Sequence, residues 1–125
     1  MNGVTLDAGA MIALDRNNRQ VIVLLARASE LGARVIVPAT ALAQVIRNPS
    51  RQARLSRLIR QADTDLVALD GPDATAAGLL LAGTGTADIV DAHVVICARR
   101  TGKVVVTSDP GDIGRIDPEL RLVAV

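Results

Sequence analysis

Residues 103–107 read Lys103-Val104-Val105-Val106-Thr107, and the polar pair Ser108-Asp109 follows at once. An apolar run without polar alternation is typical of a strand in the middle of a parallel sheet, where both faces are covered. Shorter apolar runs at Gly3–Leu6 and Arg34–Val37 predict further strands, with helical patterns between them. Strands that alternate with helices indicate the α/β class.

Outward from this run, turn and capping residues divide the chain into short elements. Asn17 or Asn18 can cap a helix that Gly32 ends, Pro38 ends a strand, and Ser50 is a plausible helix N-cap. The expected strands are residues 3–6, 34–37, 65–69, 103–107 and 120–124. The expected helices are residues 8–14, 17–31, 40–47, 50–62, 73–82 and 87–100, with one helical turn at 112–116. With no linker or repeat, we expect one domain over residues 1–125, an α/β/α sandwich with a central, mainly parallel sheet.

The composition limits both the core and the ways of binding nucleic acid. Half of the 125 residues are apolar, yet none is Phe, Trp or Tyr. The core must therefore consist of Val, Leu, Ile and Ala, and no ring is present on which a base could stack. Cys97 is the only cysteine, which excludes an internal disulfide and a thiolate zinc cluster and leaves a small core residue. We expect a cytoplasmic protein without membrane contact, since no signal peptide or long apolar run is evident.

Five aspartates occupy the places where a site is expected. Asp7 ends the first strand, Asp88 and Asp91 begin the helix at 87–100, and Asp109 and Asp112 follow the strand at 103–107. Taken singly, each has a local explanation as a cap, a first-turn acid or a turn residue. Taken together, a right-handed parallel topology would bring Asp7, Asp91 and Asp109 to one edge of the sheet. Converging carboxylates repel one another unless a cation neutralises them, so the pattern predicts an Mg²⁺ or Mn²⁺ site.

Charge is unevenly distributed along the chain. Six arginines and no acid lie between Arg34 and Arg60, although the net charge is only +1. An acidic metal site beside a basic segment favours phosphodiester chemistry.

The order and spacing of these motifs resemble the PIN-domain ribonucleases, and among them the VapC-type toxins. The resemblance covers essentially the whole chain and rests on Val4-Thr5-Leu6-Asp7, on residues 35–43 with their strand-Pro-helix pattern, on Asp91-Ala92-His93 and on Thr107-Ser108-Asp109. Two departures stand out. Gln44 occupies the position of the family's second acid, a Glu, and Ala8-Gly9 replace the hydroxyl that usually follows the first acid. Gln44 can offer a carbonyl oxygen but neither charge nor a base, so weaker metal binding and slower hydrolysis are expected.

The resemblance implies a fold, a reaction and partners. Asp7, Asp91 and Asp109 would hold the metal ions, and Asp88 and Asp112 would assist them directly or through water. Thr107 and Ser108 would orient a metal-bound water or simply end the strand. RNA would be the substrate, a cognate antitoxin would insert into the acidic groove, and the chain would form a homodimer. The residues expected on the RNA backbone are Arg47, Arg51, Arg54 and Arg57.

Several alternatives stay open. The four arginines are equally well explained as a solvated helix face. His93 could serve as a base, but a packing role fits better because a metal-bound water already supplies one. The chain could also be a degenerate PIN module that binds RNA or protein without catalysis, as Gln44 suggests. A receiver-type phosphoryl-transfer domain ranks lower, because its Lys and Asp arrangement is not present.

Overall fold

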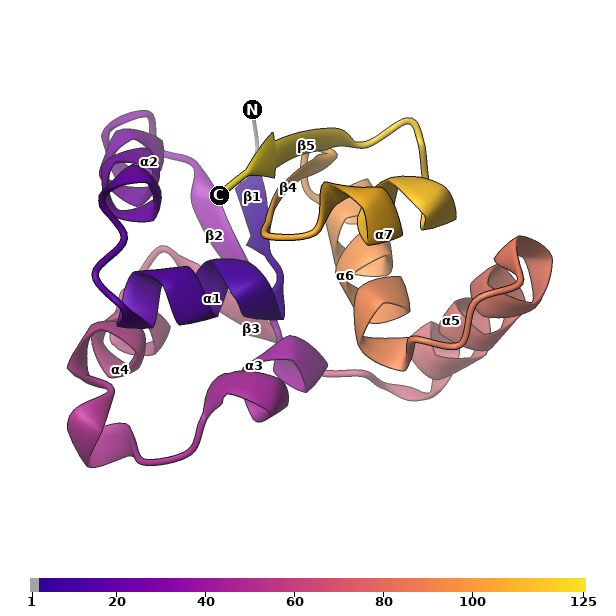
Figure 1. The fold of residues 1–125 in the computed structure, drawn as a ribbon, viewed down its shortest axis with the longest axis horizontal. Helices are drawn as coiled ribbons and strands as arrows, with labels where there is room; N and C mark the ends of the chain where they lie inside the picture. The colour runs from indigo at the N-terminus through magenta and orange to yellow at the C-terminus, as the bar shows by residue number, and fades with distance from the viewer. Residues whose placement is uncertain (1–2) are drawn as a thin grey trace.

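The computed structural model describes residues 3–125, and it has the expected α/β/α architecture (Figure 1). The strands are β1 (Gly3–Leu6), β2 (Arg34–Pro38), β3 (Thr64–Val67), β4 (Val104–Thr107) and β5 (Arg121–Ala124). The helices are α1 (Ala8–Asp15), α2 (Arg19–Glu30), α3 (Ala39–Val45), α4 (Ala53–Arg60), α5 (Gly71–Thr84), α6 (Ile89–Arg100) and α7 (Pro110–Ile116), with a 3₁₀ turn at Pro49–Arg51.

The sheet has the order β3-β2-β1-β4-β5, and every neighbouring pair is parallel. The chain builds outward from β1 to β2 and β3, then returns to the other side of β1 to add β4 and β5. The direction of winding therefore reverses between β1 and β4. The backbone N–H of Asp7 donates to the Val106 carbonyl at 3.1 Å and ties the ends of these two strands together. In parallel sheets a ligand crevice forms outside the carboxyl ends of the strands at such a point.

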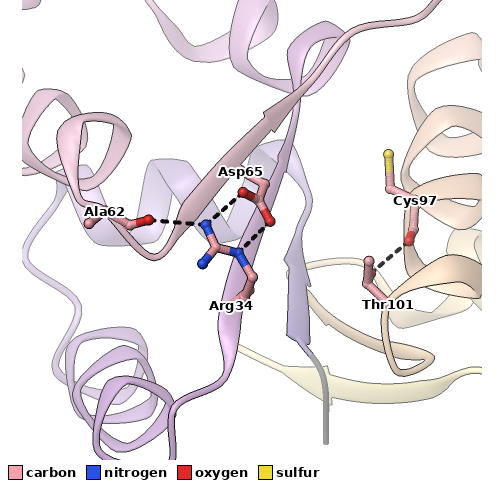
Figure 2. A network of polar contacts seen from close by, with 5 residues as sticks. All are labelled: Arg34, Ala62, Asp65, Cys97 and Thr101. Carbon is pink, nitrogen blue, oxygen red and sulfur yellow. Dashed lines mark hydrogen bonds and ion pairs between the residues drawn. The ribbon is translucent and has the colours of Figure 1, made fainter.

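Central β1 and β4 are fully buried, which confirms the interpretation of the valine run. α6 lies against β1, β2 and β4, and its residues 92–98 are all buried. Cys97 is among them, and burial raises the pKa of its thiol to about 11, so the prediction of a core cysteine is confirmed. Figure 2 shows Thr101 donating its hydroxyl to the Cys97 carbonyl at 2.7 Å near the end of this helix.

Outer β3 is joined to β2 by an ion pair as well as by the strand ladder. Arg34 contacts both carboxylate oxygens of Asp65 at 2.7 Å and also donates to the Ala62 carbonyl at 3.0 Å (Figure 2). Nearly half of each charged side chain is exposed, so solvent screens the pair and its contribution to stability is small.

The expected helix at residues 50–62 is wrong at its start. Ser50 lies in the 3₁₀ turn and donates to Asn48 Oδ1 at 2.6 Å instead of capping a helix. Gln52 causes the break: its buried amide oxygen accepts from the N–H groups of Arg47 (3.0 Å) and Asn48 (3.1 Å). Its amide nitrogen donates to the Val45 carbonyl at 3.0 Å. One side chain thereby satisfies the backbone of the turn, and α4 begins only after it.

The expected helix at residues 73–82 is longer in the structure. Asp70 caps α5 by accepting from the Asp73 N–H at 2.9 Å, and Pro72 in the first turn suits a helix start. At the other end α5 continues through the expected loop to Thr84 and ends at Gly85, whose φ of 71° lies in the left-handed region. Within residues 3–125, no single helix has the length and apolarity to cross a membrane, although α5 and α6 pass that test as a sharply bent pair.

Candidate functional site

Three of the predicted aspartates begin helices. Asp7, Asp88 and Asp109 are the N-caps of α1, α6 and α7, and each accepts with Oδ1 from the backbone N–H three residues later, at 2.8, 3.0 and 3.3 Å. The local explanation of these acids is therefore correct. It does not exclude a site, because a cap bond holds one carboxylate oxygen in place and directs the group to the helix start.

The helix starts gather at the carboxyl end of the sheet. Figure 1 shows α1, α3 and α6 beginning around the same central region with α7 opposite, and these helices contact one another in turn. Asp91 lies one turn into α6, where it is partly buried. Burial, followed by the charges of Asp88, Asp112, Asp7 and Asp109, raises the pKa of Asp91 to about 7. The five aspartates thus act on one another, and we call Asp7, Asp88, Asp91, Asp109 and Asp112 the acidic cluster.

Asp7 is the most enclosed member of the cluster, with 6% of its surface exposed. Burial raises its pKa, while hydrogen bonds from the Thr107 side chain and from the N–H groups of Ala10 and Ser108 lower it, and the charge of Asp109 raises it further. Thr107 is fully buried, and its hydroxyl oxygen accepts from the Asp109 N–H at 2.8 Å. Thr107 therefore lies between Asp7, which follows β1, and Asp109, which follows β4.

The side chains of the acidic cluster are not arranged around a single point in this structure. Among residues 3–125, no three Asp, Glu, His or Cys side chains already surround a point where a metal ion could bind. Asp112 is exposed, and its hydrogen bond with Asp109 and the charge of that group raise its pKa. The donors are all carboxylates, which suit Mg²⁺ or Mn²⁺ better than zinc. The raised pKa of Asp91 reflects burial and the negative charge of the neighbouring aspartates, and a bound cation would offset that charge.

Gln44 is exposed on α3 and lies outside the bonded network of the cluster. It lines a shallow depression of about 410 Å³ together with Arg47 and Arg51. Arg47 also donates to the carbonyls of Ala43 (3.1 Å) and Ile46 (2.7 Å), which fixes its guanidinium at the end of α3. The depression that contains the amide in place of the expected Glu is thus lined by three arginines, of which Arg16 is the third, and by the acid Asp15.

The other two arginines of the basic segment belong to a different surface. Arg54 and Arg57 line a groove of about 830 Å³ between α2 and α4, whose apolar wall includes Ile22, Leu25 and Leu58. The four arginines that the sequence placed together therefore divide into two pairs. Only Arg47 and Arg51 share a surface with Gln44.

His93 is fully buried, and its Nδ1 lies 2.7 Å from the Thr40 hydroxyl. Burial is the main cause that lowers its pKa. The prediction that His93 has a packing role is confirmed. The sequence reading missed a second buried group nearby: Asp73 pairs with Arg100, which lowers the pKa of Asp73 and joins α5 to α6. A pair of residues 27 positions apart leaves no local signal in the sequence.

The comparisons with known proteins agree with this geometry. The PIN-domain profile matches residues 4–117, so the chain belongs to the PIN-domain family. Similar solved structures include VapBC2 from Rickettsia felis bound to a DNA fragment from its promoter, with 14% identity, 98% coverage of both chains and a TM-score of 0.71. FitAB bound to the IR36 DNA fragment has 15% identity, covers 97% of this chain and 94% of its own, and has a TM-score of 0.65. FitAcB from Neisseria gonorrhoeae has 17% identity, 95% coverage of both chains and a TM-score of 0.62. At these identities the likeness shows the fold, and no curated protein sequence matches the chain.

Proposed function

We propose that the protein is a metal-dependent endoribonuclease, the toxin of a VapC-type toxin–antitoxin pair. The observation that carries the proposal is the acidic cluster at the reversal point between β1 and β4 of a PIN fold. A bound Mg²⁺ or Mn²⁺ would lower the pKa of a water molecule and offset charge on the scissile phosphate. Asp7, Asp91 and Asp109 would hold the ion, with Asp88 and Asp112 beside them.

The other residues of the site have supporting roles in this proposal. Thr107 would help to position two of these acids, because its hydroxyl accepts from the Asp109 N–H and its side chain lowers the pKa of Asp7. Because the pKa of Asp91 is raised to about 7, a cation that binds this carboxylate would compete with a proton for it near neutral pH. No Ser or Cys nucleophile is required. The direct test is cleavage of total RNA with Mn²⁺ or Mg²⁺, with a chelator as the control and with mapped fragment ends.

RNA would be held through its phosphates, since the chain has no aromatic side chain on which a base could stack. Arg47 and Arg51 line the same depression as Gln44, together with Arg16. We therefore expect the double change Arg47→Ala/Arg51→Ala to weaken RNA binding several-fold. The slope of log affinity against log salt should fall by about 1.4, since each phosphate contact on a single strand contributes about 0.7. Fluorescence anisotropy with a labelled RNA at several salt concentrations measures both quantities.

The matched control is Arg54→Ala/Arg57→Ala, which removes the same charge from the separate groove between α2 and α4. This variant should bind RNA nearly as the wild type does. Equal losses in the two double variants would show that only net charge matters and would remove the assignment to Arg47 and Arg51. Thermal melts of both variants verify that the fold is intact.

The partner in this proposal is a cognate antitoxin. One segment of the antitoxin would insert at the acidic cluster, as the resemblance implies. The groove between α2 and α4, which has an apolar wall and is lined by Arg54, Arg57 and Asp63, would hold an amphipathic part of the same partner. The similar VapBC2 and FitAB structures, each bound to DNA, support the proposal that this protein also acts with an antitoxin partner. We also propose a cytoplasmic homodimer as the working form.

Gln44 supports a second candidate function, a PIN module that binds RNA or protein without cutting. The change Gln44→Glu separates the two. In an active enzyme the added carboxylate should tighten Mn²⁺ binding about tenfold and raise the cleavage rate, because ligand charge sets affinity at oxygen sites. Calorimetric titration and a cleavage assay give the two numbers.

Gln61→Glu adds the same charge at an exposed position in the groove between α2 and α4, so it should change neither number. The enzyme proposal is abandoned if the wild type and Gln44→Glu both leave RNA intact while Asp7→Ala changes nothing measurable. RNA binding without cleavage in all three variants would then identify the degenerate module.

A further inference from the structure

Gly9 is the second residue of α1, and its backbone does not require glycine. The left-handed glycines among residues 3–125 are Gly32, Gly85 and Gly102, and Gly9 has the φ of an ordinary helical residue. Glycine is among the poorest helix formers. Its presence in a helix of eight residues therefore calls for another reason.

The reason is that another side chain occupies the place where a Cβ atom of residue 9 would lie. A Cβ atom at position 9 would lie 1.7 Å from the Ser108 hydroxyl oxygen and 2.6 Å from the Ser108 Cβ, which no real side chain can tolerate. The same point lies 3.4 Å from Asp7 Oδ1. The Ser108 side chain thus occupies the place where the side chain of residue 9 would be, beside the Asp7 carboxylate.

Ser108 is tied to the acidic cluster through its backbone, whereas the residue itself is exposed. Its backbone N–H donates to the Asp7 carboxylate and lowers the pKa of that group. The residues on either side of it are Thr107, which bonds Asp7 and Asp109, and Asp109 itself. The short link between β4 and α7 therefore packs on the first turn of α1 through the hydroxymethyl group of Ser108.

We propose that Ser108 is a positioning residue for the acidic cluster and that its side chain interlocks with Gly9. The interlock sets the distance between the start of α1, which carries Asp7, and the start of α7, which carries Asp109. This inference rests on the proposed function for what is positioned, a divalent cation. The interlock itself is a property of the metal-free fold and can be tested without a metal.

The first test measures the interlock by melting temperature in the absence of metal. Gly9→Ala should lower the melting temperature by about 5 °C or more, because an added methyl group must displace Ser108. The matched control is Gly78→Ala on α5, where an added Cβ meets nothing within 4 Å. That control should melt at or slightly above the wild-type temperature. Equal melting temperatures for the two variants would overturn the interlock.

The second test measures positioning through Mn²⁺ affinity by calorimetry. Ser108→Ala should melt as the wild type does, since the residue is exposed, but bind Mn²⁺ about tenfold more weakly, as expected for loss of a supporting contact. The exchanged pair Gly9→Ser/Ser108→Gly returns a hydroxyl to the same space from the other segment. It should recover both the melting temperature lost in Gly9→Ser and Mn²⁺ binding to within about threefold of the wild type.

The outcomes separate this inference from the proposed function. If the wild type and Ser108→Ala bind Mn²⁺ equally, Ser108 does not position the cluster, although the cluster remains a metal site. If the exchanged pair is no better than Gly9→Ser alone, the two positions are not interlocked. If the wild type binds no Mn²⁺, the proposed function fails, and the positioning role fails with it.

Discussion

Asp91→Asn is expected to abolish Mn²⁺-dependent RNA cleavage and, at the same time, to make the metal-free protein more stable at pH 8. The two effects have one cause. Asp91 is partly buried beside four other aspartates, and its raised pKa of about 7 reflects both burial and their repulsion. Asparagine is nearly the same shape and removes the charge. The metal site loses a ligand, and the folded state loses the charge repulsion between residue 91 and the other aspartates.

The pH dependence of this effect follows from the two pKa values of Asp91. In the unfolded chain the carboxyl titrates near the ordinary value of about 3.9. In the folded chain the carboxyl keeps its proton until about pH 7, so the folded state binds more protons between these values. Stability due to this group is therefore complete below pH 4, falls as pH rises to 7 and stays low above it. The stability gain from Asp91→Asn should be absent at pH 4 and largest above pH 7.

Urea unfolding at several pH values measures this gain. The full pKa difference corresponds to about 4 kcal/mol, and solvent screening of a partly exposed group reduces this to about 1–2 kcal/mol. The control is Asp88→Asn, because Asn caps helices as well as Asp does and Asp88 is exposed. It should change stability less and retain part of the Mn²⁺-induced rise in melting temperature. A lower unfolding free energy for Asp91→Asn at pH 8, or unchanged stabilisation by Mn²⁺, would contradict the assignment.

Leu6→Ala is expected to have the largest effect on stability. Leu6 is fully buried on β1, which has β2 on one side and β4 on the other, and it directly precedes Asp7. The core contains no aromatic residue, so no ring could turn into the space that the change leaves. Removing three carbon atoms from such a position costs about 3 kcal/mol, a large share of the ~5–15 kcal/mol that stabilises a typical domain.

The measurement is urea unfolding followed by far-ultraviolet circular dichroism, because a chain without Trp or Tyr has no useful intrinsic fluorescence. Leu66→Ala is the matched control: Leu66 lies on the outer strand β3 and is 50% exposed. Its unfolding free energy should change by about 0.5 kcal/mol or less. Similar losses in the two variants would mean that the centre of the sheet is no better packed than its edge.

Much of the fold was readable from local patterns. The valine run predicted β4, the run at Gly3–Leu6 predicted β1, and Asn18 with Gly32 bounded α2 within two residues. The expected helix at residues 50–62 begins too early, because the Gln52 side chain folds back on the preceding turn and bonds the backbone of Arg47 and Asn48. The residue type alone does not reveal where an amide side chain turns.

The candidate site, too, could be predicted from the sequence only in part. The sequence by itself determined the fold class and which aspartates begin helices or follow strands, because periodicity and capping act over a few residues. Only the tertiary structure decided the rest. It brought Asp91 under the charge of four other acids, separated Arg54 and Arg57 from Arg47 and Arg51, and placed Ser108 over Gly9. These relations are interactions between segments that are far apart in the chain. Their strength depends on the distance in space, which no local sequence pattern reveals.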